Sequence, residues 1–389
     1  MKILIPSDLH YPMINGVASF SRTLAQGLAA RGHEVVVIAP SQTGKRHKEI
    51  DVNHVIYRTA SVQFAPYQNV RISPTPGREV KKIIEDFDPD VIHIQMLMWI
   101  GQAAMKIGNK KGIPIVSTNH AMPENLMDNV KLLAPLARPI NYMLKEYGAR
   151  FHSKSDYVTL PTQSAIDMFN ATDKVSVPME AVSNGIDLAR YHPGKPGAEI
   201  YERFKLPQDK PIVTYVGRLD VEKHLFALIA AFARVRKELD AHLMIVGDGQ
   251  DVMNLKELAR EAGIYDAITF TGRVSEEDKY LLHQIGTVFV MPSPMELQSI
   301  ATLEAMASGQ PVVAIDAGAL GELCQDGRNG VLCEKDNDEE IAAGIITIIT
   351  DPELRTQYGA ESLKIAETHN LQTTLDRFEQ IYTSIIEKA

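Results

Sequence analysis

The stretch MPSPMELQSIATLEAMASGQPVVA, residues 291–314, gives the clearest indication of the fold and of a site. The apolar run that ends at Met291 is typical of a buried strand. The Pro- and Glu-containing residues after it predict a loop, and residues 300–308 predict a helix. A helix that begins where a strand ends directs N–H groups and its positive dipole end toward a bound ligand. The segment therefore predicts an α/β fold with a site at the carboxyl end of this strand.

Two carboxylates, Glu296 and Glu304, lie beside that site. They would repel a phosphate alone, but they suit a ligand that carries both phosphates and vicinal hydroxyls, because a carboxylate accepts two hydrogen bonds from a diol. A nucleotide sugar is such a ligand. Taken by themselves, the two residues are equally compatible with a surface helix whose dipole they compensate.

Two cations follow another predicted strand, in YVGRLDVEKHLFALIAAF (215–232). Gly217 ends that strand, Arg218 can donate to two phosphate oxygens at once, and Lys223 adds a compact second charge. Such a pair can neutralise a diphosphate leaving group without a divalent ion, so we expect no metal and no cofactor. The alternative is a pair of solvated charges, with Lys223 bound to Glu222.

Together these segments resemble the E-x7-E signature and the arginine–lysine pair of retaining glycosyltransferases of family 4, which have the GT-B fold. The resemblance covers nearly the whole chain. It implies that Arg218 and Lys223 stabilise the leaving diphosphate, that Glu296 orients the sugar and that Glu304 holds the ribose diol. It also implies phosphate contacts from the backbone amides of Gln298, Ser299 and Ile300. This chain departs from the family at Leu297 and Ser299, where glycines are usual, and Gln298 is reminiscent of the branch that glucosylates diacylglycerol.

Further candidates follow the predicted strands of both halves. Gly16, after the first strand, lets the backbone approach a ligand closely, although the segment is not G-x-G-x-x-G and Asn15 stands where the family has a glycine. His120 ends a strand, where a lone histidine is more often structural; in the resembled family it lies beside the donor sugar. The resemblance also assigns nucleobase-lining loops that contain Gly247, Arg273 and Val274.

The alternation of strands and helices predicts two Rossmann-like domains with doubly wound parallel sheets, facing a cleft. We expect an N-terminal acceptor-binding domain over residues 1–187, a linker over 188–205 and a C-terminal nucleotide-sugar-binding domain over 206–370. A final helix, 371–389, can cross back to the N-terminal domain. The predicted strands are 2–6, 34–39, 91–95, 113–118, 157–160, 212–216, 242–246, 268–271, 288–291, 311–315 and 330–332.

Composition is that of a globular protein without a spanning segment: 389 residues, 45% hydrophobic and 23% charged. The start MKILIPSDLH reads as a strand rather than a signal peptide, and Cys324 and Cys333 provide neither a disulfide framework nor a zinc site, which favours the cytoplasm. The net charge of −9 divides into +4 for residues 1–180 and −13 for the remainder. Because basic residues are sparse, no nucleic-acid partner is expected.

The acceptor side is predicted from one basic and apolar segment. Its charges alternate with large apolar residues, which suits a helix on anionic lipid and peripheral association with the inner face of the cell membrane; an ordinary core helix is the alternative. We therefore expect hexose transfer from UDP-glucose to diacylglycerol or another membrane lipid. Alternatives remain for each part of this prediction: the donor can be GDP-mannose, and the acceptor can be a soluble glycan or metabolite. Two other classes of protein also remain, a GT-B epimerase and an inactive binding protein. The basic residues are Lys131, Arg138, Lys145, Arg150 and Lys154.

Overall fold

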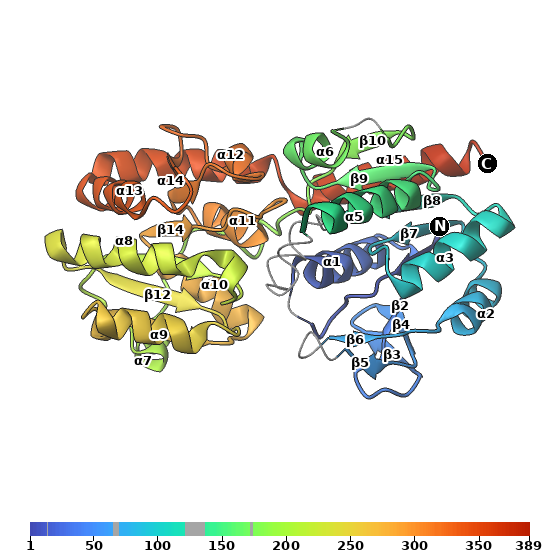
Figure 1. Cartoon of the computed structure of the whole chain (residues 1–389), viewed down its shortest axis with the longest axis horizontal. Helices are drawn as coiled ribbons and strands as arrows, with labels where there is room; N and C mark the ends of the chain where they lie inside the picture. Colours follow the sequence, from blue (N-terminus) through green and yellow to red (C-terminus); the bar gives the residue numbers. More distant parts are fainter. Residues whose placement is uncertain (14, 65–69, 121–136, 172–173) are drawn as a thin grey trace. The chain divides into compact units, whose positions relative to one another are not determined.

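The computed structural model describes residues 1–13, 15–64, 70–120, 137–171 and 174–389, with the backbone alone at 137 and 138. The chain divides into two compact units (Figure 1). Unit 1 contains the described residues of 1–120 and 137–183 together with Thr373–Ala389, and unit 2 contains Asn184–Gln372. Each unit is an α/β sandwich around its own sheet, as the repeated strand–helix pattern predicts.

The sheet of unit 2 is parallel throughout, in the order β13-β12-β11-β14-β15-β16. This is the strand order of a doubly wound fold, in which the chain changes direction between its first and fourth strands. Ligands bind such sheets outside the carboxyl ends of those two neighbours, here β11 and β14. The strands are β11 (Ile212–Val216), β12 (His242–Val246), β13 (Ile268–Gly272), β14 (Val288–Met291), β15 (Val312–Ile315) and β16 (Gly330–Cys333).

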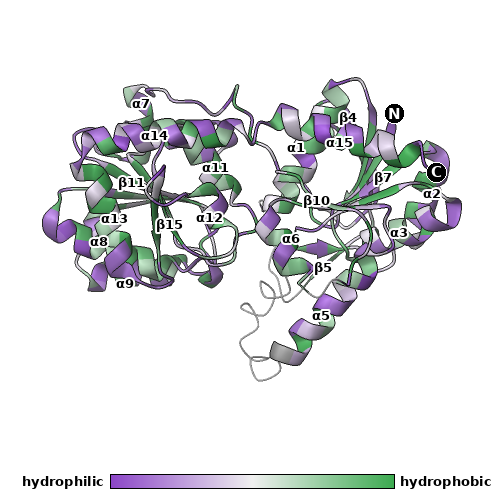
Figure 2. Cartoon of the chain, turned by 90° about the horizontal axis from the view of Figure 1, so that it is seen from above, coloured by the Kyte–Doolittle hydropathy of each residue, from purple (hydrophilic) through white to green (hydrophobic). Residues whose placement is uncertain are grey.

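Helices cover both faces of this sheet because right-handed crossovers run in opposite directions from the switch point. One layer contains α8 packed on α13, and the other contains α11 packed on α10 and α14. Both layers bury apolar stripes against strands that are mainly hydrophobic (Figure 2). The helical elements are α7 (Ala198–Phe204), η2 (Val221–Lys223), α8 (Leu225–Glu238), α9 (Val252–Glu261), η3 (Tyr265–Ala267), α10 (Glu276–Ile285), α11 (Ile300–Ala307), α12 (Leu320–Leu323), α13 (Asp338–Thr350) and α14 (Pro352–Glu367).

The larger sheet of unit 1 has the order β10-β9-β8-β7-β1-β2-β4-β3 and its own switch point between β1 and β7. The predicted doubly wound parallel sheet is confirmed, with an addition at one edge, where β3 and β4 form an antiparallel hairpin. A separate pair, β5 and β6, is also antiparallel. The strands are β1 (Lys2–Pro6), β2 (Glu34–Pro40), β3 (His47–Asp51), β4 (His54–Thr59), β5 (Val62–Gln63), β6 (Arg71–Ile72), β7 (Val91–Ile94), β8 (Ile115–Thr118), β9 (Tyr157–Leu160) and β10 (Met179–Ala181).

The last helix of the chain belongs to unit 1. Phe378 and Tyr382 on α15 (Leu371–Ile386) pack around the ring of His93, and Arg377 pairs with Glu180 at 2.5 Å. Chain ends far apart in sequence therefore share one core. The other helices of unit 1 are α1 (Gly16–Ala30), α2 (Gly77–Phe87), α3 (Trp99–Lys111), α5 (Ala137–His152) and α6 (Gln163–Phe169).

The segment 188–205, predicted as a linker, is instead part of unit 2. Tyr191 and Ile200 are buried in the core of that unit, and α7 lies within the segment. The His-Pro-Gly sequence that suggested a linker is an exposed loop, and the buried apolar residues on either side of it anchor it to unit 2. Elsewhere the predicted strands of both units are confirmed to within two residues.

Candidate active site

The switch point of unit 2 brings together a cation and a carboxylate from distant parts of the sequence. Lys223 ends the short turn η2 after β11, and Glu296 lies in the loop after β14. Lys223 Nζ donates to Glu296 Oε1 at 2.6 Å, with side chains only 17% and 12% exposed. Burial raises the pKa of the Glu296 carboxyl, but the charge and hydrogen bond of Lys223 outweigh it, so the net pKa is below its usual value. Glu296 is therefore ionised at neutral pH.

Arg218 lies on the same loop and is held by two acidic neighbours. Its guanidinium donates to Asp220 and, at 2.6 Å, to Glu222, whose other carboxylate oxygen is buried without a partner in the described part of the chain. Burial lowers the pKa of Arg218, but Glu222 and Asp220 more than compensate and raise it. The side chain stays 42% exposed, so it is oriented by protein carboxylates while remaining accessible.

The second glutamate of the motif, Glu304, lies on α11 in a buried cluster of charges. Lys279 Nζ donates to its Oε1 at 2.7 Å, and His283 Nε2 lies 3.3 Å from its Oε2. Burial raises the pKa of Glu304, but Lys279 and His283 together lower it to about 2. Sequence reasoning missed Lys279 and His283, although their spacing of four on one helix face is the signal that could have indicated a shared partner.

Backbone geometry fixes the loops around this site. A Cβ at Gly247, which follows β12 with φ +136°, would lie 1.9 Å from the carbonyl oxygen of Gly217, so only glycine fits there. Gly247 N also donates to Gly272 O at 3.1 Å, which joins the loops after β12 and β13. Arg273, which is exposed, and Val274 follow directly in the second of these loops. Gly217, Gly247, Arg273 and Val274 thus come together at one edge of the sheet.

The loop before α11 ends in a capped helix start. Ser299 accepts a hydrogen bond from Thr302 N at 3.3 Å, and the helix begins at Ile300 with N–H groups that have no partner four residues earlier. Gln298 is 3% exposed, and its Oε1 accepts from Asn184 N at 2.7 Å. Its side chain therefore serves the packing of unit 2, which leaves its backbone as the group that can face a ligand.

In unit 1, His120 follows β8 and lies in a neutral polar environment. Its Nε2 hydrogen-bonds to Gln95 Oε1 at 2.9 Å, and its ring packs on Phe20 at 5.1 Å between centroids. Burial, with a smaller contribution from His152, lowers the pKa of His120 to about 3, so the imidazole is neutral at pH 7. Because Gln95 follows β7, both side chains come from the carboxyl edge of the sheet.

Two further residues shape the loop after β1. Asn15, which stands where a glycine was expected, caps α1 by accepting from Ala18 N at 2.8 Å, and Gly16 is the first helical residue. Asp8 accepts from Ile100 N at 2.9 Å, at the start of α3. Burial raises the pKa of Asp8 to about 7, against the opposing effect of these backbone hydrogen bonds. Sequence reasoning missed Asp8, because only tertiary structure brings α3 beside it.

The basic residues predicted for a membrane surface are described in part. Lys131 and the side chain of Arg138 lie outside the described residues, whereas Lys145, Arg150 and Lys154 are exposed. The same helix, α5, also exposes Tyr142, Met143 and Tyr147. In the parts of the chain that are described, no helix combines the length and apolarity needed to cross a bilayer.

A doubly wound sheet with fixed cations and paired carboxylates at its switch point defines a nucleotide-binding transferase of two α/β units. The family model for glycosyl transferases group 1 matches residues 198–364, and the model for glycosyltransferase family 4 matches residues 14–190. The chain belongs to family 4 of the glycosyltransferases and has the GT-B fold.

Three similar proteins illustrate the range of the family. Alpha-monoglucosyldiacylglycerol synthase of Streptococcus pneumoniae is 27% identical over 388 residues, which cover 97% of this chain and 85% of that protein. GDP-mannose-dependent alpha-mannosyltransferase of Corynebacterium glutamicum is 26% identical, covering 99% and 89%. The structure of Anabaena Alr3699/HepE in complex with UDP-glucose has a TM-score of 0.72 at 19% identity, covering 99% and 100%. The chain is thus an enzyme that moves a sugar from a nucleotide sugar to an acceptor, and its relatives differ in the sugar.

Proposed function

We propose that this protein is a retaining glycosyltransferase that moves glucose from UDP-glucose to a hydroxyl of a membrane lipid such as diacylglycerol. The observation that carries the proposal is the buried pair of Lys223 and Glu296, 2.6 Å apart at the switch point of unit 2. A nucleotide sugar offers each member a partner of its own: the diphosphate suits the ammonium group, and the sugar hydroxyls suit the carboxylate.

The two cations have the main role in bond cleavage. As the anomeric bond breaks, negative charge grows on the β-phosphate, and fixed donors that face this charge lower the barrier most. Lys223 has three N–H donors and can keep Glu296 while it binds a phosphate oxygen. Arg218, oriented by Glu222, adds a forked donor, and the first amides of α11 add the positive end of a helix.

The nucleoside is assigned to the edge formed by β12, β13 and α11. Glu304 is ionised, and its lone pairs that Lys279 and His283 do not use can accept the ribose hydroxyls. Gly247 allows the backbone to approach the ribose and base, beside Arg273 and Val274. The side chains of Lys279 and His283 behind Glu304 keep its carboxylate fixed, which reduces the entropy that nucleotide binding would otherwise cost.

The mechanism we assign needs no nucleophile from the protein. The acceptor hydroxyl attacks the anomeric carbon on the face from which the diphosphate departs, and its proton passes to the leaving β-phosphate, so the anomeric configuration is retained. Glu296 orients the sugar through its hydroxyls. His120, neutral at pH 7, is the residue of unit 1 that we assign to the reaction, as a hydrogen-bonding group rather than a charge. Because Arg218 and Lys223 supply the positive charge, the proposal requires no divalent metal.

The choice of donor rests on the relatives. The pneumococcal relative is a glucosyldiacylglycerol synthase, and the Anabaena structure holds UDP-glucose. A GDP-mannose-dependent mannosyltransferase is the second candidate, because the Corynebacterium relative carries that name and covers nearly the whole chain. A GT-B epimerase is a weaker alternative, since such chemistry needs further acid and base groups, and sequence reasoning identified no convincing pair.

The lipid acceptor and a place on the inner face of the cell membrane are supported by α5. This helix alternates hydrophobic and hydrophilic residues along its length (Figure 2). Tyr142 and Met143 are 62% and 68% exposed, next to the exposed Lys145. Exposed aromatic and basic side chains on one helix suit the interface of an anionic bilayer, where rings enter the headgroup region and cations meet lipid phosphates.

A panel of nucleotide sugars tests the proposed donor. The full chain is melted with UDP-glucose, UDP-galactose, GDP-mannose and ADP-glucose, and each is then offered with diacylglycerol in mixed vesicles while released nucleotide and glycolipid are measured. We expect UDP-glucose to give the largest rise in melting temperature and an α-linked glucolipid. Stabilisation by GDP-mannose alone would favour the mannosyltransferase, and epimerised sugar without transfer would favour the epimerase. No response to any nucleotide sugar would contradict the proposed site.

A further inference from the structure

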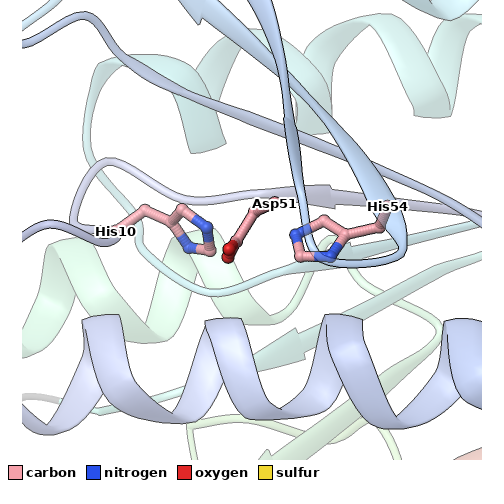
Figure 3. A group of neighbouring side chains, drawn as sticks. All are labelled: His10, Asp51 and His54. Atoms are coloured by element: carbon pink, nitrogen blue, oxygen red, sulfur yellow. The ribbon is translucent and has the colours of Figure 1, made fainter. Parts of the chain in front are cut away.

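A group of metal-ligating side chains lies in unit 1, outside the residues assigned to transfer. His10, in the loop after β1, faces Asp51 at the end of β3 and His54 at the start of β4 (Figure 3). One ligand atom from each residue lies within 4.8 Å of those of the other two. The carboxylate lies between the two imidazole rings, whose centroids are 6.5 Å apart.

The ring nitrogens of this cluster lack partners. Among the residues that the structure describes, His10 Nε2 and both nitrogens of His54 are buried without a hydrogen bond. His10 and His54 are only 1% and 3% exposed. Buried polar atoms are nearly always satisfied, because leaving one unpaired costs about 1–3 kcal/mol. A neutral imidazole has one lone-pair nitrogen, so His10 Nε2 and one nitrogen of His54 can each offer a lone pair beside this carboxylate, which points to a bound cation.

We propose that His10, Asp51 and His54 bind a transition-metal ion, with Zn²⁺ the best match. Two imidazoles and one carboxylate form a ligand set that zinc uses, with a fourth position open to water. Zinc bonds of about 2 Å require ligand atoms closer together than the upper bound observed here, so modest side-chain rotations must close the site. Asp51 and His54 are directly opposite each other across the hairpin, which already fixes two of the three ligands.

The outer contacts have the form that supports metal ligands. His10 Nδ1 hydrogen-bonds to Ser21 Oγ at 2.7 Å, which turns Nε2 toward Asp51. Arg22 Nε and Nη2 donate to the two oxygens of Asp51 at 2.6 and 2.7 Å. A carboxylate has about four lone-pair sites, so Asp51 can accept this fork and still bind a metal through a remaining lone pair.

Positive neighbours limit the affinity of the site. Arg22 and Arg58 both oppose an added divalent ion, but each has a carboxylate partner, Asp51 for Arg22 and Glu49 at 2.7 Å for Arg58. The site is separate from the diphosphate-binding cations, which belong to unit 2. Its expected effect is structural: a bound ion would fix the β3–β4 hairpin to the loop that leads into α1.

Metal binding by the untagged full chain tests this proposal. After treatment with a chelator and dialysis, the protein is titrated with Zn²⁺ by calorimetry and with Co²⁺ by visible absorption. We expect one ion per chain, intense Co²⁺ bands of a four-coordinate N/O site and a higher melting temperature of unit 1 with Zn²⁺. His54→Ala should abolish these effects, whereas His47→Ala, which removes an exposed histidine of β3, should leave them unchanged.

A second, milder substitution keeps the proposal testable if the His54→Ala variant does not fold. Ser21→Ala leaves all three ligands in place and should weaken binding about 10-fold or more, because loss of an outer partner typically costs that much. Wild-type protein that binds no Zn²⁺ or Co²⁺ would overturn the proposal. Equal stoichiometry and affinity in wild type, His54→Ala and Ser21→Ala would also overturn it, since the ion would then be bound elsewhere.

Discussion

The carboxyl edges of the two sheets accommodate buried polar side chains in opposite ways. In unit 2 they are ion pairs, Lys223 with Glu296 and Lys279 with Glu304. In unit 1 the histidine network around β7 and β8 is neutral: His120 binds Gln95, and His93 bridges Thr118 and Tyr382 through hydrogen bonds of 2.6 Å.

The contrast separates two tasks. Charged groups held by one another can exchange partners for a charged substrate, whereas a neutral network chiefly fixes shape. Substitutions at the edge of unit 2 should therefore alter turnover, and protonation in unit 1 should alter stability.

The strongest test of this comparison is Lys223→Ala. We expect turnover to fall roughly 10²-fold or more, because one fixed donor at a developing charge contributes a few kcal/mol. Lys237→Ala, on the exposed end of α8, is the matched control and should retain activity. Initial rates with saturating donor measure the effect, and rates in EDTA and in Mg²⁺ should be equal. A strict need for a divalent ion in the chemical step would contradict the role given to Arg218 and Lys223.

The two glutamates of unit 2 should give different kinetic profiles. Glu296→Gln should mainly lower kcat, since contacts with the sugar can tighten as the anomeric bond breaks. Glu304→Gln should mainly weaken nucleotide binding, about 10-fold or more in KM, because ribose contacts are alike in ground and transition states. Steady-state kinetics and calorimetry with the nucleotide measure both. Interchanged profiles would refute the two roles, and wild-type behaviour of both variants would refute the site.

Acid should destabilise the neutral network of unit 1 first. Burial lowers the pKa of both His120 and His152 to about 3, so the folded chain keeps these rings neutral while the unfolded chain protonates them below pH 6.5. Their contribution to stability is therefore complete above pH 6.5 and is lost as the pH falls toward 3, by about 1.4 kcal/mol per histidine per pH unit. The Glu304 carboxyl, with a pKa of about 2, loses its contribution only below its usual value of 4.5.

Denaturant unfolding at pH 7.5, 6 and 5 measures this difference. His152→Phe should flatten the loss between pH 6.5 and 5, and the exposed His47→Ala should not. Unit 2 also contains His242, whose pKa burial lowers to about 4, so the contrast between the units is one of degree. Equal acid sensitivity of wild type and His152→Phe would contradict the assignment of this loss of stability to the buried histidines of unit 1.

The sequence was sufficient for the parallel core because its signals are local. Strands such as Ile212–Val216 are mainly apolar, buried at every position and followed by glycine, and this pattern is typical of a sheet with both faces covered. The antiparallel edge was missed because β3 carries charged, exposed residues, so its alternation matches a loop equally well. Tyr191 and Ile200 show the same limit: Pro and Gly between them suggested a linker, and only tertiary burial places them in a core.

For the candidate site, sequence order predicted a set of residues but not the side chains that they contact. Lys223 and Glu296 could be named from their positions after strands, since neighbouring parallel strands end at the same edge of a sheet. The links of Glu304 to Lys279 and of Gln298 to Asn184 depend on packing between elements distant in sequence. The cluster of His10, Asp51 and His54 was invisible for the same reason, because it requires the hairpin that sequence reasoning missed.

The smallest expected effect concerns the surface of unit 1. Each basic residue near an anionic bilayer contributes about 1 kcal/mol at most, so α5 should hold the protein reversibly, and more weakly as salt increases. The double variant Lys145→Glu/Arg150→Glu should release the protein from vesicles rich in anionic lipid. Lys81→Glu/Lys82→Glu, an equal change of net charge on the exposed face of α2, should not. Cosedimentation measures binding, and nucleotide affinity should be unchanged because the donor residues belong to unit 2. Equal release by both variants would show that net charge alone is responsible for vesicle binding. Full transfer to a soluble acceptor without vesicle binding would refute the proposal that α5 binds lipid, and would leave the transferase assignment intact.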